Sequence, residues 1–193
     1  MSGKIKSTLE LAMEKAAKLP RLTKEEIRQQ QEKEYGPRGR AIAGRFLAGD
    51  LAEEELETEL SRYQDEQGEI VRSAFLASMC QAVEIEDSEA TARAREGIGA
   101  LVRDDQLEET FGRLSGILRD YQELWQREFA STEEAEAVAL RELGVSGSAI
   151  RINLEQSEGW RARRSALLEE FRPKLDEIKG ELSDHLRRVI SSG

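Results

Sequence analysis

Two stretches of the chain place apolar side chains at alternating intervals of three and four residues. Within 105–130 these side chains are Leu107, Phe111, Leu114, Leu118, Tyr121 and Trp125. Within 165–190 they include Phe171, Leu175, Ile178 and Leu182. Because this interval keeps side chains on one stripe of an α-helix, the pattern predicts two long helices that pair along coiled-coil-like seams.

The two predicted helices have similar lengths and are separated by a shorter helix and a turn, which favours an antiparallel hairpin or bundle within one chain. The same seams could instead pair between chains. Gly112 and Gly116 each weaken the first helix by about 1 kcal/mol relative to alanine, and Pro173 is expected to kink or restart the second. The seam side chains should therefore form either the core of the bundle or a surface for a partner.

The first 45 residues predict a helical extension of a different character. Residues 4–19 follow helical spacing through Ile5, Leu9, Ala12, Ala16 and Leu19, and a proline then ends the helix. A capping-box pattern formed by Thr23 and Glu26 starts a second, very polar helix. Glycine and proline cluster at 35–39, which predicts a turn before a short apolar helix at 41–48.

The charges are segregated along the chain and define two predicted regions. The 193 residues have a net charge of −10, but residues 1–45 have a net charge of +5, residues 46–159 of −17 and residues 160–193 of +2. We therefore predict a basic, partly flexible extension at 1–45 and an acidic helical bundle at 46–193. The basic ends are expected to pack on the acidic middle, within one chain or across a dimer. Alternatively, the N-terminal segment reaches an anionic partner.

The composition excludes several classes of protein. A single cysteine cannot form an internal disulfide, and one cysteine with one histidine cannot complete a tetrahedral zinc site. No apolar run is long enough to cross a membrane, and the first residues lack the apolar stretch of a secretory signal. We expect an all-α cytoplasmic protein without a metal ion or a cofactor.

The segment 136–154 resembles the helix–turn–helix of bacterial DNA-binding proteins. Leu143, Val145 and Ile150 occupy apolar positions of that motif, and Gly144 lies at its turn. The resemblance implies that four arginines contact DNA phosphates: Arg151, Arg161, Arg163 and Arg164. Across 132–158, however, acidic residues outnumber the two arginines, which opposes binding to a polyanion. We therefore favour a helix that ends at Gly144 and continues as a loop, and nucleic acid is not the expected partner.

Cys80 and His185 occur once each and are the candidates for a nucleophile and its general base. Cys80 lies in an apolar helical stretch and His185 continues the second seam, so both are expected to pack structurally. No third residue is identified that would orient the pair. An enzyme activity is therefore not expected.

The sequence thus predicts an elongated all-α bundle or antiparallel coiled-coil hairpin with a helical N-terminal extension. The predicted function is non-catalytic: an interaction, scaffold or regulatory protein that self-associates or binds a protein partner through helix–helix contacts. The alternative is a DNA-binding regulator that uses 136–154.

Overall fold

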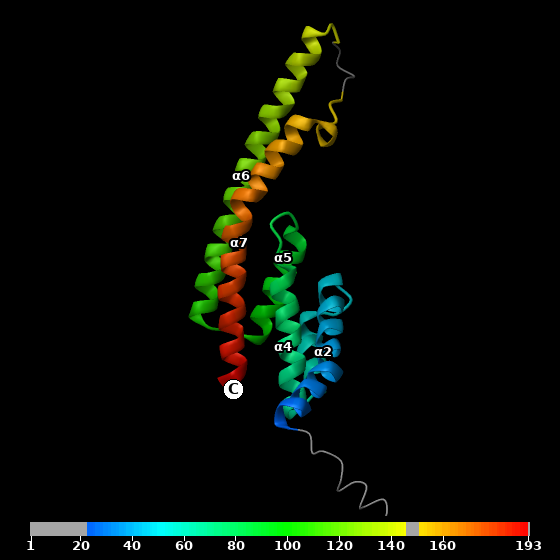
Figure 1. The fold of residues 1–193 in the computed structure, drawn as a ribbon, viewed down its shortest axis with the longest axis vertical. Helices are drawn as coiled ribbons and strands as arrows, with labels where there is room; N and C mark the ends of the chain where they lie inside the picture. Colours follow the sequence, from blue (N-terminus) through cyan, green and yellow to red (C-terminus); the bar gives the residue numbers. More distant parts are fainter. Residues whose placement is uncertain (1–22, 146–150, 193) are drawn as a thin grey trace, which may run out of the picture.

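The computed structural model describes residues 23–145 and 151–192, which form six α-helices and a short 3-10 helix (Figure 1). The helices are α2 (Lys24–Ala48), α3 (Glu53–Leu60), α4 (Asp65–Ala82), α5 (Ser88–Leu101), α6 (Asp105–Glu142) and α7 (Glu158–Ser192), and the 3-10 helix η1 covers Leu154–Gln156. These described residues contain no strand, so the predicted all-α fold is confirmed. The helix predicted at 4–19 lies outside them.

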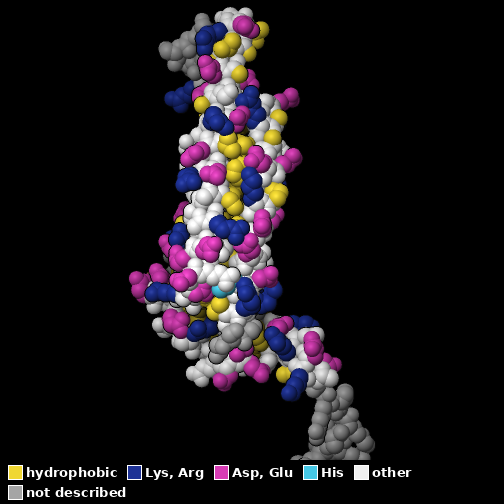
Figure 2. Space-filling model, turned by 90° about the vertical axis from the view of Figure 1, so that its left-hand side faces the viewer, with side chains coloured by type: hydrophobic (Ala, Val, Ile, Leu, Met, Phe, Trp, Pro, Cys, Tyr) yellow, Lys and Arg dark blue, Asp and Glu magenta, His cyan; other side chains and the backbone are white. Residues whose placement is uncertain are grey.

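The helices form two groups that share one apolar core. Helices α2, α3, α4 and α5 form a bundle, while α6 and α7 run antiparallel as a long hairpin. The hairpin joins the bundle where α7 packs against α4, and its far end extends well beyond α5 (Figure 1). Figure 2 shows that apolar side chains on the outer face of the hairpin form a narrow strip flanked by charges of both signs.

Helix α2 begins as the sequence predicts. The hydroxyl of Thr23 accepts a hydrogen bond from the backbone N–H of Glu26 (3.2 Å), and the backbone N–H of Thr23 donates to the Glu26 carboxylate (2.7 Å). These two bonds satisfy donors that a helix N-terminus otherwise leaves unpaired. The predicted capping box is therefore confirmed.

The turn predicted at 35–39 is wrong, because α2 continues through Pro37. Gly39 faces α4 so closely that an added Cβ would lie 2.8 Å from the Cβ of Ala74 and would overlap the carbonyl oxygen of Val71. Glycine at this position allows the two helices to approach, and the packing outweighs the local preference for a turn.

Helix α2 also crosses the boundary expected at residue 45. Ile42, Ala43 and Phe46 are buried, and the ring of Phe46 meets that of Phe75 edge to face at a centroid distance of 6.1 Å. The buried residues of α2, from Gly36 to Phe46, are thus part of the packed bundle.

The seams predicted at 105–130 and 165–190 lie in α6 and α7 respectively. Eight of their side chains are buried in the core: Leu107, Phe111, Leu114, Tyr121, Phe171, Leu175, Ile178 and Leu182. Leu118 and Trp125 remain half-buried. Pro173 does not restart the second helix, because α7 is one helix that contains it.

An aromatic cluster packs the hairpin beyond α5. The indole of Trp160 is fully buried and meets the rings of Trp125 and Phe129 edge to face, at centroid distances of 5.2 and 5.1 Å. Trp125 and Phe129 stack on each other at 4.9 Å. These large rings let two helices alone enclose an apolar layer.

Polar contacts connect α7 to the segment between α4 and α5. The ammonium of Lys179 donates to the backbone oxygens of Gln81 (3.2 Å) and Val83 (2.8 Å), and so caps the C-terminal end of α4. The carboxylate of Glu86 accepts two hydrogen bonds from the guanidinium of Arg164 (2.8 and 3.0 Å) and one from the Tyr121 hydroxyl (3.1 Å). These contacts fix the hairpin relative to the bundle.

Candidate helix-binding groove

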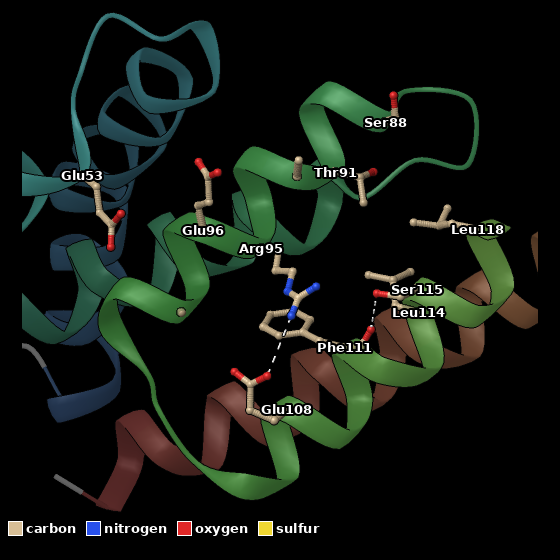
Figure 3. A pocket seen from close by; sticks show the side chains of 12 residues that line it. Glu53, Ser88, Thr91, Arg95, Glu96, Glu108, Phe111, Leu114, Ser115 and Leu118 are labelled. Carbon is tan, nitrogen blue, oxygen red and sulfur yellow. Dashed lines mark hydrogen bonds and ion pairs between the residues drawn. The ribbon is translucent and has the colours of Figure 1, made fainter.

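An open groove lies between α5 and α6 (Figure 3). Helix α4 packs against both α5 and α7, and α7 packs against α6, so α5 and α6 are the outer members of a four-helix row. The row is curved, and its two outer helices face each other across a volume of about 570 Å³.

The groove has an apolar floor and a wall of small side chains. Phe111, Leu114 and Leu118 of α6 form the floor, and Leu118 is the member that is only half-buried. On the α5 wall, Ala92 and Gly99 leave room, since an added Cβ at Gly99 would meet no atom within 4 Å. Small residues in such a wall let another backbone approach closely.

The rim of the groove is acidic. Three carboxylates line it, from Glu53, Glu96 and Glu108, against the single guanidinium of Arg95. That guanidinium lies over the Phe111 ring and points towards Glu108 (Figure 3), 5.2 Å from the ring centre and 3.8 Å from the Glu108 carboxylate. Because Arg95 already has an acidic neighbour and an aromatic one, the charge left to attract a ligand is negative.

No family model matches this chain, and neither a curated protein nor a solved structure does. The functional argument therefore depends on the geometry of the groove itself.

Part of this groove could be predicted from the sequence and part could not. Phe111, Leu114 and Leu118 belong to the first predicted seam, which the structure places at the boundary between the hairpin core and the groove. The sequence pattern does not indicate the opposite wall from α5 or the contribution of Glu53. Both depend on the packing of helices that are far apart in the sequence, and no spacing of residues along the chain indicates that packing.

The segment 136–154 does not show the second helix of a helix–turn–helix in its described part. Helix α6 ends at Glu142, and Gly144 has a left-handed backbone conformation with φ of 77°. Residues 146–150 lie outside the described residues, and the stretch 151–157 contains only η1. The observed end of α6 agrees with a helix that stops at Gly144.

Three of the four arginines assigned to DNA phosphates have partners within the protein. Arg161 donates to the backbone oxygen of Gln156 (2.6 Å), and Arg163 donates to the carboxylate of Glu128 (2.9 Å). Arg164 is held by Glu86, as described above, while Arg151 is exposed. Ion pairing of Arg163 and Arg164 with glutamates reduces the positive potential that phosphate binding requires.

Cys80 is buried in the apolar core, and His185 contacts the carboxylate of Asp104. Burial raises the pKa of the Cys80 thiol to about 11, which disfavours the thiolate that a nucleophile needs. The Nε2 atom of His185 lies 2.7 Å from one carboxylate oxygen of Asp104, whose other oxygen accepts a hydrogen bond from the backbone N–H of Leu107 (2.8 Å). Asp104 thus caps the start of α6 and fastens it to α7.

Two hydrogen bonds lower the pKa of Asp104. The one from the backbone N–H of Leu107 has the larger effect, and the one with His185 has the smaller. The carboxylate form is therefore the one that the fold stabilises.

Two further properties concern the described part of the chain. None of its helices is long and apolar enough to cross a lipid bilayer. No group of three or more histidine, cysteine, aspartate or glutamate side chains within 23–145 and 151–192 is arranged to hold a metal ion.

Proposed function

We propose that this protein is a non-catalytic helical interaction protein that binds one further α-helix in the groove between α5 and α6. The observation that carries the proposal is the open groove between the two helices, whose floor is formed by the buried Phe111 and Leu114 and by Leu118, the floor residue that reaches solvent. A helix laid along this floor would cover Leu118 and complete the packing of both walls.

The dimensions of the groove suit a helix. Its α5 wall runs from Ser88 to Gly99 and its α6 wall from Glu108 to Leu118. At about 1.5 Å per residue these walls are about 15–17 Å long, which corresponds to three turns of a bound helix. The groups of its rim that titrate lie on the surface and do not converge on a reacting centre, which supports binding over catalysis.

A photo-crosslinking amino acid at position 118 of the full chain tests the proposal. We expect it to give one major covalent product, with a second copy or with one partner. Mass spectrometry should locate the crosslinked residues of the attached segment at intervals of three or four, as on one face of a helix. The same amino acid at Asp120, an exposed position of α6 outside the groove, is the control and should give no such product. Equal products from both positions, or none from either, would refute the proposal.

A pair of substitutions separates binding from stability. Leu118→Glu places a charge on the floor of the groove and should abolish the association, because a buried carboxylate without a partner is costly. Leu124→Glu affects a residue that is also half-buried in α6 but does not line the groove. It should cost similar stability and leave the association intact, as measured by analytical ultracentrifugation and thermal unfolding.

A further inference from the structure

We infer that the groove between α5 and α6 binds residues 4–19 of a second copy of this chain. This inference rests on the proposed helix-binding function of the groove and names its occupant. Three observations support it: charge, length and reach.

The charges of the two surfaces are complementary. Residues 1–22 hold five lysine or arginine residues and two glutamates, whereas the groove rim holds three glutamates and one arginine. At 100° per residue, a helix over 4–19 would place Lys4 and Lys15 along one edge of its apolar stripe and Lys6 along the other. Both glutamates of the segment would lie on the face away from the groove. The basic edges would therefore meet the acidic rim.

The apolar stripe of the segment matches the floor of the groove in length. The stripe runs from Ile5 to Leu19 and includes Ala12 and Ala16. In a helix it would be about 21 Å long, slightly longer than the groove walls of about 15–17 Å. The small alanine side chains allow a close approach to the α5 wall, where Ala92 and Gly99 also leave space.

Reach determines which copy supplies the segment. Gly97 of α5 packs against the ring of Phe46, so the groove begins level with the C-terminal end of α2. Phe46 is about 35 Å along α2 from Thr23, where the described chain starts. The residues between Leu19 and Thr23 span at most about 13 Å even when extended. A chain therefore cannot lay the whole stripe along its own groove, whereas a second copy can.

Exchange of this kind closes a symmetric dimer. Each copy carries one basic segment and one groove, so two copies related by a twofold axis satisfy both grooves and leave no segment over. The expected mass in solution is twice the chain mass of 21.8 kDa.

Disulfide trapping between two differently tagged chains tests the exchange. One full-length chain carries Ala12→Cys and the other carries Ser115→Cys, at an exposed position that lines the groove. Mild oxidation of the mixture should give a covalent heterodimer on a non-reducing gel. Replacing Ser115→Cys with Asp120→Cys, which lies outside the groove, should give at least tenfold less. No excess over this control would overturn the inference, as would a chain that carries both Ala12→Cys and Ser115→Cys and forms the disulfide only within itself.

A charge exchange tests the contact by another route. Lys15→Glu and Glu96→Lys should each raise the dissociation constant of the dimer about fivefold, because each substitution replaces a favourable surface contact by an unfavourable one in both halves of the dimer. The chain with both substitutions should dimerise more tightly than either single variant, and Lys24→Glu in the exposed first turn of α2 should have no effect. Simple addition of the two losses would contradict the inference.

The two proposals can fail separately. If Lys15→Glu does not weaken dimerisation while the crosslink from position 118 persists, the groove binds another helix, and the assignment of residues 4–19 of a second copy is wrong. If position 118 gives no crosslink at all, the helix-binding function itself is wrong.

Discussion

Replacing Gly39 by alanine should destabilise this protein, although alanine is the better helix former. Alanine in a helix interior gains about 1 kcal/mol over glycine. At this position, however, the new methyl group would overlap the carbonyl oxygen of Val71 and lie 2.8 Å from the Cβ of Ala74. The carbonyl belongs to the backbone of α4 and cannot rotate away, so the two helices must separate.

Overpacking typically costs about 1–3 kcal/mol, and a clash with backbone should lie in the upper part of this range, at about 2–3 kcal/mol. After the gain in propensity of about 1 kcal/mol, the expected net effect is a loss of about 1–2 kcal/mol. With a urea dependence of about 2 kcal/mol per molar, the unfolding midpoint should fall by about 0.5–1 M. Urea titration followed by circular dichroism at 222 nm gives this midpoint directly.

Gly44 provides a matched control in the same helix. An added Cβ at Gly44 would meet no atom within 4 Å, so Gly44→Ala retains only the gain in helix propensity. Its unfolding midpoint should rise by about 0.5 M. If Gly39→Ala is as stable as the unmodified protein, the close approach of α2 and α4 is incorrect, and with it the explanation for the continuous α2.

Three further predictions concern titratable groups. The fold lowers the pKa of Asp104, so its carboxylate contributes stability above the pKa that Asp104 has in the unfolded chain. This contribution is lost as the pH falls through the pKa in the folded protein. Measured by urea unfolding, Asp104→Asn should therefore lose less stability between pH 5 and pH 2 than the unmodified protein. Burial, followed by Glu86, raises the pKa of Tyr121 to about 12, so Glu86→Gln should lower it towards 10 in an ultraviolet titration while burial keeps it above that value. The Cys80 thiol, with a pKa of about 11, should react with a disulfide reagent at pH 8 at least tenfold more slowly in the folded protein than in urea; equal rates would show that the thiol is accessible.

The long helices could be predicted from the sequence because their apolar spacing is regular. The apolar side chains from Leu107 to Trp125 alternate at intervals of four and three residues. This spacing places them on one stripe of α6, which packs against α7. The bundle of α2 to α5 is harder to predict, because at Gly39 and Gly97 its helices approach so closely that an added Cβ would not fit. A local pattern treats Gly36, Pro37 and Gly39 as a turn, and only the presence of α4 makes Gly39 a packing residue.

The candidate groove shows the same division. Its floor comes from a seam within one helix, which a sequence pattern can identify. Its opposite wall comes from α5, and two of its three rim carboxylates belong to Glu96 of α5 and to Glu53 at the start of α3. The spacing along the chain does not reveal that these elements meet α6. The hydrogen bonds of Arg163 to Glu128 and of Arg164 to Glu86 likewise join side chains at least 35 positions apart.

The cap that Lys179 places on the end of α4 has a consequence for how the chain acquires its structure during synthesis. Val83 and Lys179 are separated by 96 positions, so the ribosome releases the early helices long before their capping ammonium exists. Until then, the backbone oxygens of Gln81 and Val83 lack this partner. A nascent or truncated chain that lacks α7 should consequently hold α4 with a frayed end, and the bundle of α2 to α5 reaches its full stability only after α7 has been synthesised.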